Sequence, residues 1–229
     1  MAELPDLPRT EAQIVEATNV FRLSQGLAPV ARNLALEHAA KLFAQYLAKS
    51  GRFAHEADGR QPADRTRAAG YWHCAIAENL ALNLDSRGFT AQRLALEVVE
   101  GWKGSPGHRR NMELPNVTEI GVGVAQAVHK DPKFISVQVF GRPKHLAYAF
   151  RVANKSTMAV NYRFAGKAYA VAPLEIVKHT ACNPEKITFV NAGSWLVGSQ
   201  IGEHVDAADG LLVTLNSAAG GKVRVDTGR

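Results

Sequence analysis

Apolar residues recur at helical spacing through the first fifty positions of the chain. Thr10 and Gln13 form a capping-box pattern that begins a first helix, and Gly26 offers its C-terminal stop. Asn33 caps a second helix after a short connection. The apolar faces of these two helices are formed by Ile14, Ala17 and Phe21, with Thr18, and by Leu36, Ala39, Ala40, Phe43, Ala44 and Leu47.

Two more helices are expected before position 105. Pro62 suits the first turn of a short helix that stops at Gly70, and Thr90 opens a longer one. The apolar face of the longer helix is formed by Leu94, Ala95, Val98, Val99 and Trp102, and Ser105-Pro106-Gly107 breaks it. The segments between these helices, around His55 and around Glu78, are interpreted as loops.

The pattern then changes to alternation of apolar and polar residues. The runs Glu119–Ala125 and Phe134–Phe140 predict a β-hairpin. Gly121 and Gly123 leave one face of the first strand without side chains, so a helix or a ligand can approach its backbone closely. Helices followed by an antiparallel hairpin indicate a layered α+β domain.

A division is expected near Gly141-Arg142-Pro143-Lys144, giving one domain over residues 1–143 and a second over 144–229. Downstream of this point no long helical period is visible, and short strands are predicted instead. The second domain is therefore expected to be a small all-β, sandwich-like fold. Its strands are predicted at 148–152, 158–164, 168–172, 186–191, 195–201 and 211–215, with a last one through Val223 and Val225.

Charge and length exclude some classes of protein. The chain has 229 residues and 27 basic against 21 acidic side chains, a net charge of +6. No Lys/Arg run is interleaved with aromatic residues, which makes nucleic acid an unlikely partner, and the arginines at 65, 67, 109 and 110 are interpreted as solvated. No apolar run is long enough to span a membrane, and Met1–Pro5 does not resemble a signal peptide.

The two cysteines do not form a metal-binding or redox motif. Cys74 and Cys182 lie far apart in the sequence and form no CxxC pair. Two buried free thiols are the favoured interpretation, since free cysteine is among the most often buried residue types. A single long-range disulfide, which would indicate an oxidising compartment, remains the alternative.

The candidate chemistry lies between positions 55 and 111. His55, Glu78 and His108 supply two imidazoles and a carboxylate, which together can bind a divalent metal, move protons or hold a polar ligand. His73 lies beside Cys74 and near Glu78, which also allows a metal site, whereas the remaining five histidines have no partner pattern. All six are interpreted as structural or solvated. Ser105 lies three residues before His108, a spacing that suggests a nucleophile beside a base, but termination of a helix explains its position as well.

Short motifs in this region occur in the order and approximate spacing of a known family. Residues 11–141 resemble the CAP superfamily, which includes the cysteine-rich secretory and pathogenesis-related 1 proteins, and in particular its bacterial SCP-like members. The matching motifs are Asn19-x-x-Arg22-x-x-x-Gly26-Leu27, Phe53-Ala54-His55, Ala69-Gly70-Tyr71, Glu78-Asn79, Trp102, Ser105-Pro106-Gly107-His108-Arg109-x-Asn111 and Gly121-x-Gly123.

This resemblance implies a three-layer α-β-α sandwich with a cleft lined by two histidines and acidic residues. His55, Glu78 and His108 fall on the cleft positions and would be metal ligands, with zinc or another divalent cation as the cofactor. Ser105 stands where eukaryotic members have a second glutamate. Asn79, Ser105 and Asn111 are the candidates for ligand binding, although such asparagines more often satisfy backbone groups.

Three functions follow as expectations. The first is an exported bacterial binding module, secreted or periplasmic, whose cleft holds a divalent metal and whose partner is a lipid, a cell-envelope component or another protein. The second is a metal-dependent hydrolase or peptidase that uses the same cleft. The third is a structural adhesion protein that acts through its β-rich tail. Because the cleft residues include no obvious nucleophile, a non-enzymatic role is favoured.

Overall fold

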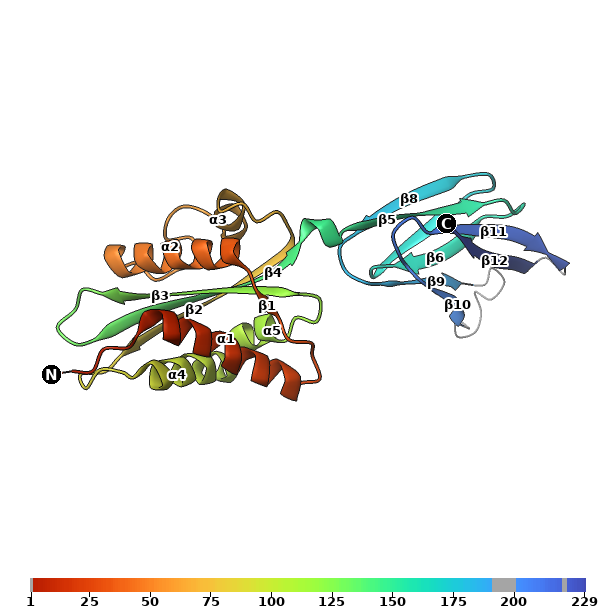
Figure 1. Cartoon of the computed structure of the whole chain (residues 1–229). Coiled ribbons are helices and arrows are strands. Elements are labelled where there is room, and N and C mark those ends of the chain that lie inside the picture. The colour runs from red at the N-terminus through yellow and green to blue at the C-terminus, as the bar shows by residue number, and fades with distance from the viewer. Residues whose placement is uncertain (1, 191–200, 220–221) are drawn as a thin grey trace. The chain divides into compact units, whose positions relative to one another are not determined.

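The chain folds into two compact units, Met1–Lys144 and His145–Arg229 (Figure 1). The computed structural model describes residues 2–190, 201–219 and 222–229. The first unit combines helices with one sheet, and the second consists of strands, so the predicted α+β fold followed by an all-β region is confirmed.

The helices of the first unit begin at polar caps. The side chain of Asn33 accepts hydrogen bonds from the amides of Ala35 and Leu36, and that of Thr90 accepts one from Arg93, as the sequence predicts. The predicted start at Thr10 is wrong. Asp6 caps this helix instead, with Pro8 in the first turn. The helices are α1 (Leu7–Ser24), α2 (Leu34–Ser50), α3 (Pro62–Ala68), α4 (Ala91–Gly104) and α5 (Pro106–Met112).

Two elements in this unit differ from the sequence prediction. Residues His73–Leu84, interpreted as loop, form the long strand β2, and the Ser-Pro-Gly segment ends α4 but also begins α5. Proline fits the first turn of a helix because its missing N–H would have no partner there. Both corrections concern the candidate site, because β2 carries Glu78 and α5 carries His108.

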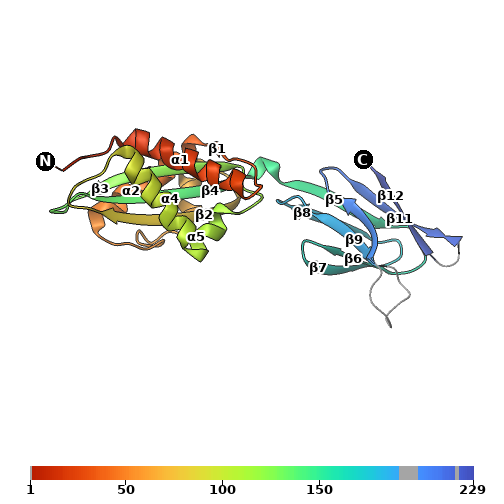
Figure 2. The ribbon, with the colours of Figure 1, turned by 90° about the horizontal axis from the view of Figure 1, so that it is seen from below.

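A four-stranded sheet forms the middle layer of the first unit. Its strand order is β1-β3-β4-β2, with β1 (Ala31–Arg32) parallel to β3 (Glu119–Ala127), while β3, β4 (Lys133–Pro143) and β2 are antiparallel. Helices α2 and α3 cover one face of the sheet (Figure 1). Helices α1, α4 and α5 cover the other face (Figure 2). The predicted three-layer α-β-α sandwich is therefore the observed architecture.

Each face of the sheet has its own apolar core. Trp102 fixes α4 to the edge strand by donating from Nε1 to the carbonyl of Leu80 at 2.9 Å. The core under α1 and α4 contains Ile14, Phe21, Leu94, Val98, Trp102, Ile120, Val122, Phe134 and Phe140. The core under α2 contains Leu36, Ala40, Phe43, Leu47, Leu80, Ile135, Val137 and Val139.

The two glycines of β3 let α2 lie directly on the sheet, as predicted. A Cβ atom at Gly121 would stand 2.2 Å from the carbonyl carbon of Leu36, and one at Gly123 would stand 2.3 Å from the amide nitrogen of Lys41. These distances are far inside van der Waals contact, and the atoms they meet belong to the helix backbone. The close approach fixes the height of α2 above the strands.

The second unit contains two four-stranded sheets that share one core. Their orders are β10-β9-β6-β7 and β12-β11-β5-β8, and all pairs are antiparallel except β11 with β5. Strand β8 was missed in the sequence, and the strand predicted at 195–201 lies almost wholly outside the described residues. The strands are β5 (Tyr148–Asn154), β6 (Val160–Phe164), β7 (Lys167–Val171), β8 (Ile176–Ala181), β9 (Lys186–Val190), β10 (Ile201–Asp206), β11 (Leu212–Ala218) and β12 (Lys222–Gly228).

Two further features concern the whole chain. The interpretation of the cysteines as free thiols is wrong, because Cys74 and Cys182 are both disulfide-bonded. Within the part of the chain that the structure describes, no helix is sufficiently long and apolar to cross a bilayer.

Candidate functional site

The candidate site is built around β2, which forms an edge of the central sheet. Glu78 pairs with Val139 and Asn79 pairs with Gln138, so these neighbours point to opposite faces. Glu78 faces the layer of α2 and α3, while Asn79 faces the layer of α1 and α5. Two adjacent residues of β2 therefore supply polar side chains to both helical layers at one position along the strand.

The Glu78 carboxylate is buried and held by an arginine. Arg65 donates from Nη2 to both carboxylate oxygens, at 3.0 and 2.8 Å, and both side chains are almost fully shielded from solvent. His55 Nδ1 lies 2.8 Å from the same Oε1 atom that accepts the longer of these bonds. Glu78 is thus an acceptor shared by a guanidinium and an imidazole.

Arg65 is itself fixed from several sides, which overturns the interpretation of this residue as solvated. Its Nη1 donates to Asp58 Oδ1 at 2.9 Å and to the carbonyl of Arg60 at 2.8 Å, and its guanidinium stacks over the Phe43 ring at 3.5 Å. A chemical requirement could have indicated the role of Arg65 from the sequence. A carboxylate placed in a cleft needs a cationic or donor partner, and α3 supplies arginines nearby in the chain.

His55 follows α2 on a turn and is half-exposed, with 49% of its side chain accessible. Because an ionised carboxylate only accepts hydrogen bonds, the contact with Glu78 places the proton of the neutral imidazole on Nδ1. Nε2 is then left with its lone pair and without a partner in the described residues. A carboxylate that fixes a histidine in this way also makes its second nitrogen a better metal ligand or base.

Asn79 and Asn111 connect β2 to the opposite layer. Asn111 donates to the backbone carbonyl of Glu78 at 3.1 Å and to Asn79 Oδ1 at 2.8 Å. Asn79, fully buried, donates to the carbonyl of His108 and to Gln138 Oε1. Their amide groups therefore hold α5 against β2. In the described conformation only Asn111, which lines the cleft, is open to a ligand.

His108 lies on α5 and is partly buried. The pKa of His108 is lowered, chiefly by burial and secondly by the nearby imidazole of His55. This second cause indicates that the two rings lie near one another although they come from opposite layers, and His108 itself is not part of the lining of the cleft beside His55. Ser105 is the N-cap residue of α5, but its side chain makes no capping hydrogen bond.

The structure brings some of the predicted metal ligands together. His55 contacts Glu78 directly and lies near His108, but Arg65 engages both oxygens of Glu78. Among the described residues no group of three or more His, Cys, Asp or Glu side chains is arranged to hold a metal ion. The donors that remain open are the two imidazoles.

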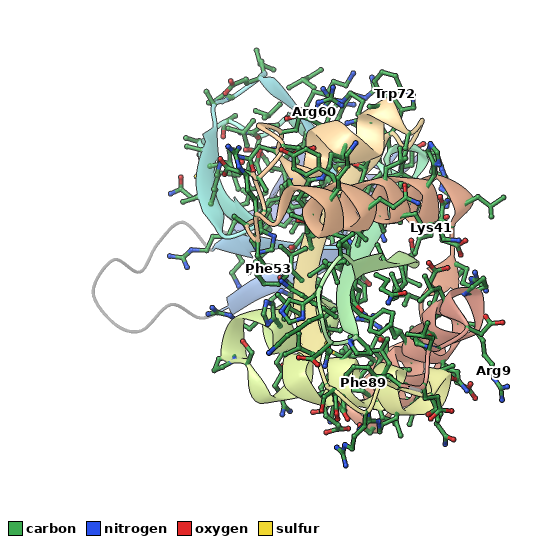
Figure 3. All side chains as sticks on the ribbon, turned by 90° about the vertical axis from the view of Figure 1, so that its left-hand side faces the viewer. Arg9, Lys41, Phe53, Arg60, Trp72 and Phe89 are labelled. Carbon is green, nitrogen blue, oxygen red and sulfur yellow. The ribbon has the colours of Figure 1, made fainter. Side chains whose placement is uncertain are left out.

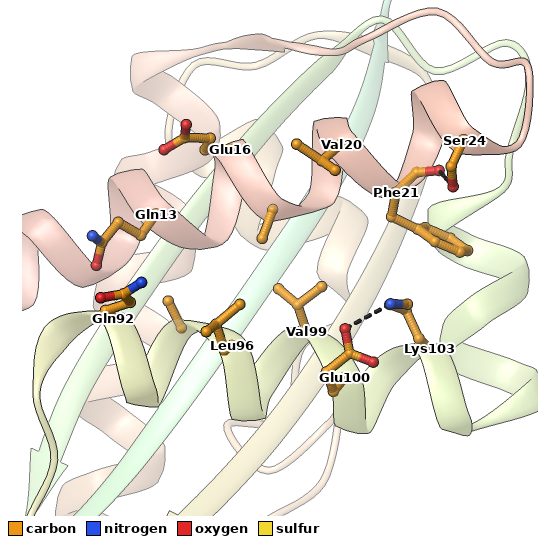
Figure 4. Close-up of a pocket in the computed structure, with 12 residues that line it drawn as sticks. Gln13, Glu16, Val20, Phe21, Ser24, Gln92, Leu96, Val99, Glu100 and Lys103 are labelled. Carbon is orange, nitrogen blue, oxygen red and sulfur yellow. Dashed lines mark hydrogen bonds and ion pairs between the residues drawn. The ribbon is translucent and has the colours of Figure 1, made fainter.

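The first unit has a cleft beside these residues and a separate hollow between two helices of its other layer. A cleft of about 500 Å³ beside His55 is lined by Pro62, Glu78 and Asn111 among others. A second hollow, of about 400 Å³, runs between α1 and α4 (Figure 4). It has an apolar floor and polar ends, and we name it the α1–α4 groove. Its lining includes Gln13, Glu16, Ala17, Val20, Phe21, Ser24, Gln92, Ala95, Leu96, Val99, Glu100 and Lys103.

One of the solved structures that resemble the chain agrees with this architecture. An outer surface protein of Borrelia burgdorferi matches with a TM-score of 0.52 at 20% identity, covering 63% of this chain and 100% of that one. An extracellular SCP-domain protein of Bacillus anthracis matches with a TM-score of 0.49 at 22% identity, covering 59% and 41%.

Sequence comparison identifies the family. YkwD, an uncharacterised protein of Bacillus subtilis (strain 168), is 32% identical over 118 residues, which are 51% of this chain and 43% of the relative. The chain thus spans less than half the length of this relative. The family described as "CAP: Cysteine-rich secretory protein family" matches residues 15–140, more than half of the chain. The chain therefore belongs to the CAP family of cysteine-rich secretory proteins, through its first unit.

Proposed function

We propose that this chain is an exported bacterial CAP-domain protein that acts as a binding module. Its cleft takes a divalent cation such as Zn²⁺ on His55 and His108, and its partner is a lipid or another component of the cell envelope. The observation that carries the proposal is the Glu78–His55 contact, which fixes one imidazole and leaves its Nε2 open beside a second imidazole.

The donor chemistry fits zinc with one change from the sequence expectation. Neutral imidazoles are good zinc ligands, and catalytic or exchangeable sites leave coordination positions to water. Glu78 serves to orient His55, as carboxylates do behind metal-bound histidines, instead of binding the ion itself. Arg65 then fixes Glu78, so the support of His55 extends into the buried part of the domain.

Removal of either imidazole tests this site. We expect His55→Ala and His108→Ala each to weaken zinc binding by more than the roughly 10–100-fold seen when a residue behind a metal ligand is removed, because each supplies a ligand nitrogen itself. The measurement is isothermal titration of metal-free protein with zinc chloride. Because the pKa of His108 is lowered, this imidazole loses its proton at a lower pH than an ordinary histidine. Protons should therefore compete with zinc for His108 only at a lower pH than they do for an ordinary histidine.

His129→Ala is the matched control. His129 is an exposed histidine on the β3–β4 turn, and its ring contacts only the backbone of Asp131 in the described residues. This variant should bind zinc as the wild type does. Equal zinc affinity in the wild type and in the double variant His55→Ala/His108→Ala would show that the cleft is not a metal site.

The α1–α4 groove supports the lipid part of the proposal. The α4 side chains Leu96 and Val99 face Val20 and Phe21 of α1 across it (Figure 4). A hollow with an apolar floor and polar ends suits an acyl chain with a polar head. We expect Leu96→Arg to abolish displacement of a fluorescent acyl probe by fatty acids, while Leu42→Arg, on an exposed position of α2, leaves it unchanged. Equal displacement by wild type and Leu96→Arg would exclude the groove.

A hydrolase is the second candidate, and the Glu78–His55 pair favours it. A carboxylate that fixes an imidazole is also the arrangement that orients a general base. Among the described residues, Ser105 forms no hydrogen bond with either histidine, so the binding role is preferred. A peptide and peptidoglycan digest compared between wild type and His108→Ala separates the two, since only a hydrolase loses activity in the variant.

Export is supported by two observations. Both cysteines are disulfide-bonded, and disulfides persist mainly in oxidising compartments such as the periplasm and the extracellular space. The Borrelia protein of similar fold is described as an outer surface protein. The β unit at His145–Arg229 would then contact a surface or partner outside the cell. The adhesion function is therefore proposed for that unit.

A further inference from the structure

Apolar side chains are exposed at the end of the central sheet where β4 begins. Phe53 follows α2, Leu82 and Leu84 end β2, and Val128 lies on the turn after β3. All four side chains are at least four-tenths exposed, and Val128 is fully exposed. Figure 3 looks at this end of the domain, where Phe53 is labelled.

These side chains are exposed because α2 ends before the sheet does. On the α2 face, Leu82 pairs with Ile135 and Leu84 pairs with Lys133. Helix α2 stops at Ser50, with Gly51 in the left-handed conformation that ends helices. A hollow of about 400 Å³ remains beyond the helix end, and its lining includes Phe53, Leu82 and Val128. The end of β2 and the start of β4 therefore form an apolar surface that α2 does not cover.

The charged side chains that line this hollow have one sign. Lys49, Arg52 and Lys133 contribute to its lining, and no aspartate or glutamate does. In the part of the chain that the structure describes, none of these three side chains forms an ion pair. Cations left without carboxylate partners around exposed apolar groups are complementary to a surface that is anionic outside and apolar beneath.

We propose that this distal patch, made of Lys49, Arg52, Phe53, Leu82, Leu84, Val128 and Lys133, docks onto the surface of an anionic phospholipid bilayer. The cations meet phosphate at headgroup level, and the apolar side chains enter the interface beside them. A bilayer is favoured over a small ligand because the exposed Leu84 lies outside the lining of the hollow and Val128 at its rim is fully exposed, so the apolar surface is larger than the hollow itself. The patch is separate from the His55 cleft and from the α1–α4 groove, so the proposal does not depend on either.

Vesicle sedimentation with the full chain tests the proposal. We expect the protein to sediment with vesicles of mixed phosphatidylcholine and phosphatidylglycerol, and far less with phosphatidylcholine alone, and binding should weaken as salt rises. Replacing Lys49, Arg52 and Lys133 with glutamine should lower the partition coefficient roughly 100-fold, about fivefold for each cation. The double variant Phe53→Ser/Val128→Ser should also lower it, while keeping the charge.

The control for charge is Lys167→Gln/Lys178→Gln/Lys222→Gln, which removes three exposed cations from the second unit and gives the same net charge. It should bind vesicles nearly as the wild type does. The control for apolar surface is Leu42→Ser, which removes an exposed apolar side chain of α2 outside both the patch and the α1–α4 groove. Equal binding to both kinds of vesicle, unchanged binding by the patch variants, or an equal loss in the controls would overturn the proposal. So would binding of monomeric fatty acid at the patch without binding of vesicles.

Discussion

Arg65→Ala is expected to destabilise the CAP domain by about 3–5 kcal/mol, the cost of removing one partner of a buried ion pair. The arginine is buried, and it donates to both oxygens of an equally buried Glu78 carboxylate. Without it, the carboxylate keeps only the contact with His55. The alanine also leaves space against Phe43, on whose ring the guanidinium stacks.

The measurement must separate the two units of the chain. Denaturant unfolding followed by hydrogen exchange of β2 and β4 reads the CAP domain alone, since both strands belong to its sheet. Arg67→Ala is the control. It removes the same side chain type from the same helix. Arg67 is exposed, and among the described residues its guanidinium interacts only with the Trp72 ring, so the effect should stay within about 0.5 kcal/mol.

A double-mutant cycle supplies the decisive outcome. If the Arg65–Glu78 pair acts as a unit, the double variant Arg65→Ala/Glu78→Ala should lose less unfolding free energy than the two single variants lose together. The difference should be about 0.5–3 kcal/mol. Additive costs would contradict the reading of these contacts as one coupled pair. We also expect Arg65→Ala to weaken zinc binding, because His55 loses the carboxylate that is held in place behind it.

Local rules predicted the parts of this fold whose cause is local. Asn33 and Thr90 start helices because their side chains satisfy free amides of the first turn, which depends on few neighbouring residues. The first helix shows the limit of the same rule. Thr10 and Asp6 both have capping side chains, and Pro8 between them fits the helix started by Asp6, which is the helix that forms.

Strand β2 was missed because its residues do not alternate cleanly. The run His73–Leu84 contains Glu78, Asn79 and Asn83 among small and apolar residues, and its burial pattern is uneven along its length. Its strand conformation is decided by tertiary pairing with β4, which leaves the polar side chains of the candidate site on both faces of the sheet. The polar residues of the candidate site thus interrupt the alternation of apolar and polar residues by which a strand is recognised in a sequence.

The candidate site also has a part that the sequence indicates and a part that depends on tertiary packing. The resemblance of short motifs to the CAP superfamily indicated His55, Glu78 and His108, and the structure places the first two in contact. The role of Arg65 could not be read from spacing, because it depends on α3 packing across the face of β2. The partner of a buried charge is a property of the packed domain, so it appears only when the layers are in place.

Gly121→Ala is expected to destabilise the domain by about 3 kcal/mol, at the upper end of the cost of overpacking a core. The added methyl group would lie 2.2 Å from the carbonyl carbon of Leu36 and 2.3 Å from the amide of Glu37. Both atoms are helix backbone, so no rotamer change can relieve the clash and α2 must move as a body. That movement would shift Phe43 beneath Arg65, and hence loosen the support of Glu78 and His55.

Gly101→Ala gives the matched comparison with the opposite sign. Gly101 lies in α4, is exposed, and an added Cβ would meet nothing within 4 Å. Alanine is a better helix former than glycine by about 1 kcal/mol, so this variant should stabilise the domain. Thermal unfolding of both variants, with hydrogen exchange of α2 as the local readout, checks the pair. A neutral Gly121→Ala would mean that α2 can rise from the sheet at little cost, and that the glycines of β3 do not set the height of the helix that precedes the cleft.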